Sequence, residues 1–416
     1  MKRGPRVAAS RSGGPKPPVR RGSEAGLASL LEQHRVVVCV GSGGVGKTTV
    51  AASLALAAAC AGRRAIVLTI DPARRLADSL GVGPIGNTPR SVPLDGLVAR
   101  PGGSLDAMML DQKGSWDELV ERHAPSPEMA ARIRENPFYQ QLSESFAGSQ
   151  EYMAVEQLDA LIASGRFDLV VVDTPPSQHA IDFLEAPQRL LRFLDRSVVR
   201  WFVSPPGGIG WSALQVMNRT TGFLLRQLES ATGLRTLGQV SDFFNEMSGL
   251  FDGFEERFQR VMGLLRDART AFVLIASPDE QVLGQVDFLM GRMNALHMPL
   301  KGVVMNRIHD GVLAPEIEVL DDEALRAGLQ AALEPLAPGC EDLVGRLHAN
   351  IRAHQARARG DALRIESFRD DLGAALPLVE VPELEGDVHD LPSLAGLLGY
   401  LLAGAPALPP GAATQS

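Results

Sequence analysis

The stretch VVVCVGSGGVGKTTVAAS, residues 36 to 53, places an apolar run, a glycine-rich turn and a helix-forming segment in immediate succession. It matches the pattern GxxxxGK[ST], in which a strand leads into a phosphate-binding loop and the loop leads into a helix. In such a loop the backbone N–H groups converge on phosphate oxygens, and the helix N-terminus adds partial positive charge. The stretch therefore predicts a nucleotide-binding site. A chance glycine turn is the alternative, and the flanking patterns favour the phosphate loop.

Each polar residue of the loop has an expected role except one. Lys47 is expected to reach the β- and γ-phosphates, and Thr48 to offer its hydroxyl to Mg²⁺. Ser42, directly after the first glycine, has no role in the pattern. The predicted nucleotide-binding segment comprises Gly43, Gly44, Val45, Gly46, Lys47, Thr48 and Thr49.

Short apolar runs recur along the chain, with helical stretches between them. Continuous rather than alternating apolar character is typical of strands buried on both faces of a parallel sheet. The sequence therefore predicts one α/β domain with a doubly wound, mostly parallel sheet. The runs are RVVVCV (35–40), AIVLTI (65–70), DLVVVD (168–173), AFVLIA (271–276), GVVMN (302–306) and LVEV (378–381), with weaker edge-strand candidates at 94–100 and 105–111.

Two long insertions, from about 114 to 164 and from about 185 to 269, interrupt this rhythm, and both are expected to be helical. We predict a disordered basic arm over 1–30, a nucleotide-binding domain over 31–403 and a disordered tail over 404–416. In the second insertion, apolar residues fall on one helical stripe. The stripe comprises Val240, Phe243, Phe244, Met247, Leu250, Phe251, Phe254, Phe258, Val261, Met262 and Leu265.

The composition limits the partners. With a formal net charge of −8 over 416 residues, no global field gathers nucleic acid, and no nucleic-acid partner is expected. The basic arm either touches anionic lipid or RNA or is a solvated tail. No secretory signal and no run of about 18 apolar residues is seen, which predicts a cytoplasmic protein. Cys39, Cys60 and Cys340 are far apart and form no CxxC, which argues against disulfides and thiolate metal sites.

Two carboxylates follow predicted strands. Asp173, at the end of DLVVVD, is placed to hold the Mg²⁺ shell through water. Asp71, at the end of the second strand, either orients an attacking water or caps a helix that starts at Pro72. His179, in the loop after Asp173, is either a catalytic base or a structural hydrogen-bonding residue.

The fifth strand carries information about the base. Guanine-binding proteins of this architecture place an NKxD carboxylate against the base, whereas this strand ends in Asn306-Arg307-Ile308-His309. The Asn is present, but the Lys and the Asp are not. This favours adenine, with the Asn306 amide bonding the base edge, and therefore ATP.

Taken together, GSGGVGKTT, DPARRLADSLG, AGSQEYMAVEQL, DTPPSQHAIDFLE, VMNRI and VPELEGDVHDLPSL resemble the ArsA family of ATPases, in family order from about Val36 to Leu398. That family includes the arsenical pump ATPase and the eukaryotic ATPase that targets tail-anchored membrane proteins. The resemblance implies a dimer that closes on ATP and Mg²⁺, with Asp71 positioning the hydrolytic water and Asp173 near Mg²⁺. It also implies that Asn306 and the Pro382 segment surround adenine, and that the 185–269 insertion carries client-binding helices. The stripe then either lines a hydrophobic groove or packs on its own domain.

The sequence departs from the family in three ways. The family loop reads GKGGVGKT, and its first Lys reaches across the dimer, whereas here that position is Ser42. The zinc CxxC of the targeting ATPase is absent, and so are the arsenite-binding cysteines. Three explanations of Ser42 stay open: a heterodimer with a paralogue bearing Lys there, a cation supplied in cis by Arg74 or Arg75, or a homodimer whose slow turnover suffices for a switch.

We therefore expect an ATP-hydrolysing switch of the ArsA type that handles a hydrophobic protein client or membrane-associated partner. The alternative is a positioning ATPase of the MinD or ParA sort, which should end in an amphipathic membrane helix or carry a basic DNA-binding face. After Leu391 only a short apolar segment and a Pro/Ala tail follow. A small-molecule kinase would need an acceptor pocket with its own base and a lid of arginines.

Overall fold

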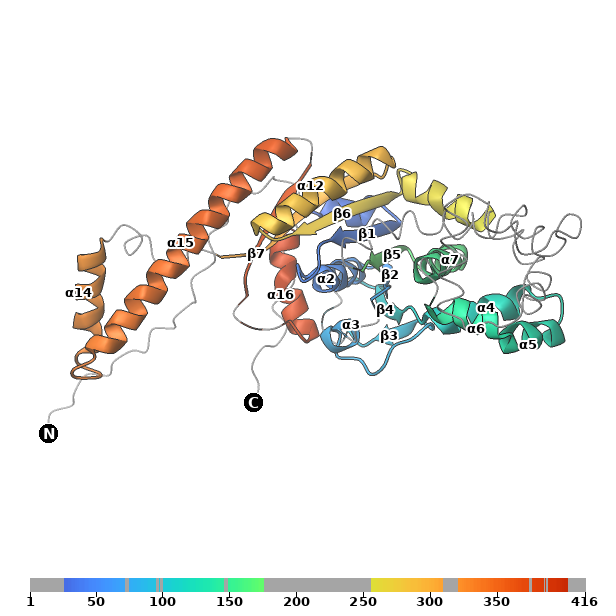
Figure 1. Ribbon diagram of the computed structural model, residues 1–416, viewed down its shortest axis with the longest axis horizontal. Helices are drawn as coiled ribbons and strands as arrows, with labels where there is room; N and C mark the ends of the chain where they lie inside the picture. Colours follow the sequence, from blue (N-terminus) through green and yellow to red (C-terminus); the bar gives the residue numbers. More distant parts are fainter. Residues whose placement is uncertain are drawn as a thin grey trace, which may run out of the picture.

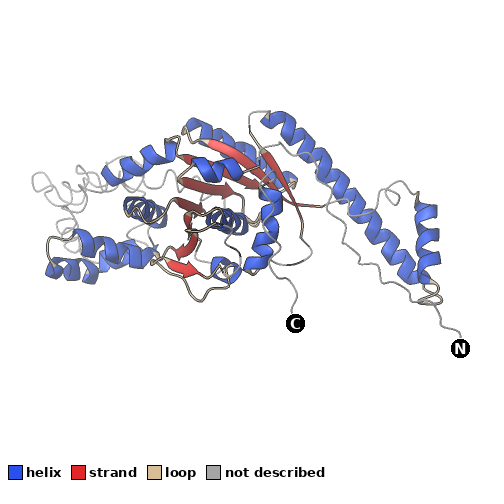
Figure 2. Ribbon diagram, turned by 180° about the vertical axis from the view of Figure 1, so that it is seen from behind, coloured by secondary structure: helices blue, strands red, loops and turns tan. Residues whose placement is uncertain are grey.

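The computed structural model describes residues 26–71, 75–94, 97, 100–145, 149–175, 256–309, 321–373, 376–384, 386 and 388–402. A single sheet lies at the centre, and helices cover both of its faces (Figure 1, Figure 2). The described strands are β1 (Val36–Gly41), β2 (Arg64–Thr69), β3 (Arg90–Val92), β4 (Ser104–Met109), β5 (Leu169–Asp173), β6 (Thr270–Ala276), β7 (Leu300–Ile308) and β8 (Leu378–Pro382). The described helices are α1 (Ala28–Gln33), α2 (Lys47–Cys60), α3 (Arg75–Ser79), α4 (Gln112–His123), α5 (Pro127–Glu135), α6 (Pro137–Ser145), α7 (Ser149–Ala163), α12 (Glu280–Ala295), α14 (Asp322–Leu333), α15 (Glu341–Leu372) and α16 (Leu391–Leu401).

The strand order is β3-β4-β2-β5-β1-β6-β7-β8. All neighbouring pairs are parallel except β3 with β4, which confirms the doubly wound α/β fold. The expected edge strand at 105–111 is β4. In the segment 94–100, the described Leu94, Leu97 and Arg100 are not in a strand, and the antiparallel edge strand β3 lies just before it. In the strand order, β2 to β5 lie on one side of β1 and β6 to β8 lie on the other. The order of the strands therefore reverses at β1, and a topological switch point lies at its carboxyl end.

Apolar packing explains the centre of the sheet. Every residue of β1 is buried, as its continuous apolar run predicts. Helix α2 is buried all round from Val50 to Cys60, and its alanines let it lie close against the strands. The short apolar segment after Leu391 is α16, which packs on α2 through four buried leucines. These are Leu394, Leu397, Leu398 and Leu401.

The folded body begins earlier than residue 31, where the sequence placed its boundary. Leu27 and Leu30 are buried, and the Leu27 N–H donates to the Leu401 carbonyl at 3.0 Å. The cause is the apolar face of α1, which joins the core under α2 and α16. Residues 1–25 of the expected basic arm and 403–416 at the tail lie outside the described residues.

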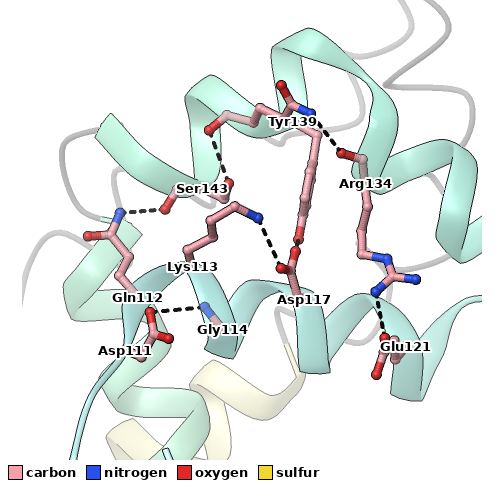
Figure 3. A network of polar contacts seen from close by, with 10 residues as sticks. Asp111, Gln112, Lys113, Gly114, Asp117, Glu121, Arg134, Tyr139 and Ser143 are labelled. Atoms are coloured by element: carbon pink, nitrogen blue, oxygen red, sulfur yellow. Dashed lines mark hydrogen bonds and ion pairs between the residues drawn. The ribbon is translucent and has the colours of Figure 1, made fainter. Parts of the chain in front are cut away.

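The first insertion is helical, as expected, and consists of α4, α5, α6 and α7. Side-chain hydrogen bonds join α4 to α6 (Figure 3). Asp117 accepts hydrogen bonds from the Tyr139 hydroxyl at 2.7 Å and from Lys113 Nζ at 3.0 Å. Gln112 Nε2 donates to the Ser143 carbonyl at 2.8 Å. The insertion is thus a packed helical layer beside the sheet.

Most of the second insertion, residues 185–255, lies outside the described residues, and with it the stripe from Val240 to Phe254. Residues 256–266 are helical, and the end of the stripe is buried in the core of this domain. For these residues the alternative of packing on their own domain is confirmed, because they belong to the hydrophobic core. They are Phe258, Val261, Met262 and Leu265, each at most 2% exposed.

Helices α14 and α15 form a hairpin that projects away from the sheet (Figure 1). Arg352 of α15 pairs with Asp322 of α14 at 2.6 Å. The C-terminal part of α15 is anchored by Asp361, which is 3% exposed. Its carboxylate accepts hydrogen bonds from His309 N at 2.9 Å, His309 Nδ1 at 2.7 Å and Arg364 at 2.7 Å. Among the residues that the structure describes, none of the helices combines the length and apolar character needed to cross a bilayer.

Candidate nucleotide-binding site

The predicted site residues come together at one edge of the sheet. The strands β1, β2, β5, β7 and β8 run parallel, so their carboxyl ends meet at that edge. The glycine loop follows β1, Asp71 follows β2, and Asp173 ends β5. Asn306 lies near the end of β7, and Pro382 ends β8. This edge, at the switch point, is where open α/β sheets bind ligands.

The glycine loop has a backbone that only glycine adopts easily. Gly46 begins α2 with φ of 92°, and Gly44 has φ of 78°. A Cβ on Gly46 would lie 2.4 Å from Asn306 Nδ2, so the loop is also closely packed there. The Asn306 side chain donates to the Val45 carbonyl at 2.8 Å, which joins β7 to the loop.

Lys47 is 7% exposed and rests inside the loop. Its Nζ donates to the Ser42 carbonyl at 2.7 Å. Burial lowers the pKa of Lys47, and Arg75 acts in the same direction, while Asp173 and Asp71 oppose them. An ammonium carries three N–H donors, so Nζ retains donors for further acceptors beside the Ser42 carbonyl.

Asp173 is fully buried at the end of β5, beside the start of α2. Its Oδ2 accepts hydrogen bonds from the Thr48 hydroxyl at 2.7 Å and the Thr69 hydroxyl at 2.9 Å. Its Oδ1 is buried and finds no hydrogen-bond partner among the described residues. Burial raises the pKa of Asp173 to about 6, although the hydrogen bonds from Thr48 and Thr69 and the charge of Lys47 lower it. A free carboxylate oxygen beside the Thr48 hydroxyl fits the oxygen shell of Mg²⁺.

Asp71 is half-buried just beyond β2. Its charge acts on the pKa of both Lys47 and Asp173, so the three ionisable groups share one electrostatic environment. Gln150, at the start of α7, donates from Nε2 to the Ile70 carbonyl at 2.5 Å and so holds the peptide before Asp71. The helix-cap alternative for Asp71 involves residues 72–74, which lie outside the described residues, as do Arg74 and His179.

Pro382 and Asn306 are linked through the end of β7. Ile308 pairs with Pro382, and the Glu383 N–H donates to the Ile308 carbonyl at 2.9 Å. Arg307, between Asn306 and Ile308, has a left-handed φ of 59°. The Asn306 side chain bonds the loop carbonyl here, so its role at adenine stays a prediction.

Three polar side chains that the sequence did not single out, those of Thr69, Gln150 and Gln285, support the site. Thr69 bonds Asp173, and Gln150 bonds the peptide before Asp71. Ser42, 3% exposed, donates from its hydroxyl to Gln285 Oε1 on α12 at 2.7 Å. A polar residue inside the apolar strand AIVLTI was a signal for Thr69. Gln285 gave none, because it lies far from the loop in sequence.

The cysteines take no part in this chemistry. Cys39, Cys60 and Cys340 are free and buried. Burial raises the pKa of the Cys39 thiol, and the nearby Asp173 charge raises it further. Cys39 is therefore an inert thiol of the strand core.

Comparison with known proteins gives one family. The family described as "Anion-transporting ATPase" (ArsA ATPase) matches residues 34–321. The chain is 25% identical over 287 residues to "ATPase get3" of Pyrenophora tritici-repentis, covering 68% of this chain and 76% of that protein. It is 26% identical over 292 residues to "ATPase get3" of Botryotinia fuckeliana, with coverage of 68% and 76%. It is 32% identical over 175 residues to "Protein Rv2184c" of Mycobacterium tuberculosis, covering 40% of each chain.

Proposed function

Because the chain belongs to the anion-transporting ATPase family, also called ArsA ATPases, we propose that it is a dimeric, Mg²⁺-dependent ATP-hydrolysing switch that captures or delivers a protein or membrane-associated partner. The observation that carries the nucleotide chemistry is the convergence of Lys47, Thr48 and Asp173 at the end of β1 and β5. The switch acts in the cytoplasm, and its client is a hydrophobic protein segment, as the family resemblance implies.

The chain's own residues divide the chemistry as follows. The loop N–H groups and Lys47 bind the phosphates, and Asn306 with the Pro382 segment holds adenine. Thr48 and Asp173 hold Mg²⁺, which neutralises charge on the phosphate oxygens when bound. Asp71 orients the attacking water, and such positioning is most of what phosphoryl transfer asks of a protein.

The first test is ATP turnover by a Lys47→Ala variant. Loss of the ammonium should abolish ATP binding or turnover, because Lys47 is the one charged residue in the loop sequence from Gly41 to Thr48. Lys301→Ala, on an exposed part of β7, is the matched control and should leave turnover unchanged. Wild-type turnover in the Lys47 variant would reject the assignment.

Adenine preference is tested separately by competition between ATP and GTP. Asn306 without a following Lys and Asp favours ATP. Equal or tighter binding of GTP would reject the base assignment without touching the phosphate assignment.

Ser42 bears on whether the chain forms a homodimer or a heterodimer. A homodimer lacks the cation that the family Lys supplies in trans, and the absence of such a cation slows phosphoryl transfer by roughly 10³-fold or more. A heterodimer with a paralogue bearing Lys at this position restores that charge at this chain's site. The cis alternative is supported by Arg75, whose charge already acts on the pKa of Lys47.

The assay compares the purified wild type with three variants, Ser42→Lys, Arg74→Ala and Arg75→Ala. A large gain in turnover from Ser42→Lys supports the missing trans cation. Fast wild-type turnover that is lost on removing either arginine supports the cis cation and rejects the heterodimer.

The partner surface lies, on this proposal, in the part of the insertion between 185 and 255. The stripe residues after it, such as Phe258, are already covered by the domain core. Partners are captured with Asp71→Asn held in ATP, which should trap the closed state. Phe251→Asp should then lose the partner while retaining the fold and ATP turnover; unfolding of that variant would assign Phe251 to the core.

The packing of α16 favours this function over membrane positioning. Its four leucines are buried against α2, so it offers no apolar face to a membrane. Mg²⁺-ATP-dependent binding to anionic vesicles by the purified protein, without a client, would reverse this preference.

A further inference from the structure

The glycine loop is held from outside at two points. Between Gly41 and Lys47 the loop consists of glycines, Val45 and Ser42, so Ser42 is its only polar side chain. The Ser42 hydroxyl donates to Gln285 of α12 at 2.7 Å, and the Val45 carbonyl accepts from Asn306 of β7 at 2.8 Å. Helix α12, which follows β6, and strand β7 thus hold the two halves of the loop.

The place of Gln285 follows from the sheet. Strand β6 pairs with β1 up to the register Gly41–Ile275, and α12 starts soon after β6 ends. The first turns of α12 therefore lie beside the loop. A Cβ on Gly41 would be 2.1 Å from the Ile275 carbonyl oxygen, which shows how closely the two strands' ends approach.

We propose that Gln285 is a positioning residue of the ATPase, which holds Ser42 so that the loop backbone is already arranged for the nucleotide phosphates. A glycine-rich loop loses much conformational freedom when it is ordered around a ligand. An anchor that orders the loop beforehand strengthens binding, because less freedom remains to be lost. The Ser42 carbonyl also accepts from Lys47 Nζ, so the same anchor sets the resting place of that ammonium.

The pair is neutral, and this separates it from the trans cation discussed above. A hydroxyl and a carboxamide add no charge at the phosphates, so the pair should act on nucleotide affinity rather than on the rate of phosphoryl transfer. The inference rests on ATP binding by the loop and is independent of the partner.

The test is a double-mutant cycle of Ser42→Ala and Gln285→Ala, with equilibrium binding of a fluorescent ATP analogue (mant-ATP) as the measurement. Each single variant should raise the Kd roughly two- to tenfold, the effect of losing one neutral hydrogen bond. The Kd of the double variant should be no higher than the higher Kd of the two single variants, because each substitution removes the same hydrogen bond. For Gln285→Ala, kcat at saturating ATP should stay within about twofold of the wild type.

Asn294→Ala is the matched control, since Asn294 carries an exposed carboxamide at the far end of α12. It should leave the Kd and the melting temperature unchanged. Additive effects of the two substitutions overturn the proposal, as does an unchanged Kd in Gln285→Ala. A lowered melting temperature with unchanged Kd assigns Gln285 a structural role only and also overturns it. If the wild type itself does not bind mant-ATP, the nucleotide assignment fails instead.

Discussion

Replacing Asp173 with Asn is expected to stabilise the metal-free protein while removing its response to Mg²⁺-ATP. The wild-type carboxylate is fully buried, and one of its oxygens has no hydrogen-bond partner among the described residues. An Asn amide has nearly the same shape and no charge. Its carboxamide still bonds the hydroxyls of Thr48 and Thr69, which turn to serve as donors or acceptors.

The magnitude follows from the pKa. The pKa of Asp173 is raised from 3.8 to about 6 in the folded protein, mainly by burial. A shift of about 2 pKa units corresponds to about 3 kcal/mol. Because the folded state holds the proton more tightly than the unfolded chain, the free energy of unfolding falls as the pH rises from about 4 to about 6. Above about pH 6 the whole penalty is present, so Asp173→Asn should gain up to about 3 kcal/mol there.

The assay is urea unfolding in EDTA without nucleotide, followed by tryptophan fluorescence. The free energy of unfolding of the variant should exceed that of the wild type at pH 7.5. The difference between the two should approach zero below about pH 4. In a second experiment, Mg²⁺-ATP should raise the melting temperature of the wild type, because it binds only the folded state, and should do so much less in the variant.

Asp168 lies just before β5, and Asp168→Asn is a control in which the expected change in stability has the opposite sign. Hydrogen bonds from Arg64 lower the pKa of Asp168 to about 2. Its stabilising contribution is present above about pH 4 and is lost as the pH falls toward 2, so this variant should be less stable than the wild type at pH 7.5. The loss should be small, because the side chain is 39% exposed and solvent screens the pair. A lower stability of Asp173→Asn than of the wild type at pH 7.5, or a gain that does not depend on pH, would show that burial of the Asp173 charge does not destabilise the fold.

Three further outcomes are expected. Gln150→Ala should lower kcat several-fold with little change in the Kd for ATP, because it frees the peptide before Asp71; a changed Kd with unchanged kcat in single-turnover assays would contradict this. Phe258→Ala should lower the free energy of unfolding by about 3–5 kcal/mol in urea titrations, because Phe258 is a core aromatic residue. A loss under about 1 kcal/mol would instead indicate that Phe258 belongs to the partner surface. Leu398→Ala should lower the free energy of unfolding by about 2–5 kcal/mol, whereas unchanged stability would show that α16 is not part of the core.

The sequence predicted that Thr48 and Asp173 lie close together because its signals for these two residues are local. The glycine loop is one continuous pattern, and Asp173 stands at the end of an apolar run, so both positions follow from strand direction alone. The positions of Thr48 and Asp173 with respect to each other then follow from parallel strands. The hydrogen bond of 2.7 Å between their side chains agrees with that placement.

The supporting contacts were beyond the sequence because they join distant segments. Ser42 and Gln285 are 243 positions apart, and Asn306 and Val45 are 261 apart. The sequence shows where a polar side chain stands in the chain, but its hydrogen-bond partner depends on the order of the strands in the sheet. The same reason applies to Phe258, because a helical stripe shows that one face is covered and does not show by what.

The anchoring of the α14–α15 hairpin has a mechanical consequence. The part of α15 between Glu341 and Asp361 is about 30 Å long at about 1.5 Å per residue, and it extends away from the sheet (Figure 1). Its fulcrum, the contact of Asp361 with His309, lies three residues after Asn306, which touches the phosphate loop. A tilt of only about 5° at that fulcrum would sweep the far end of the lever through about 3 Å. A displacement of β7 at the loop that tilted α15 would therefore be detectable with a distance probe at the hairpin tip.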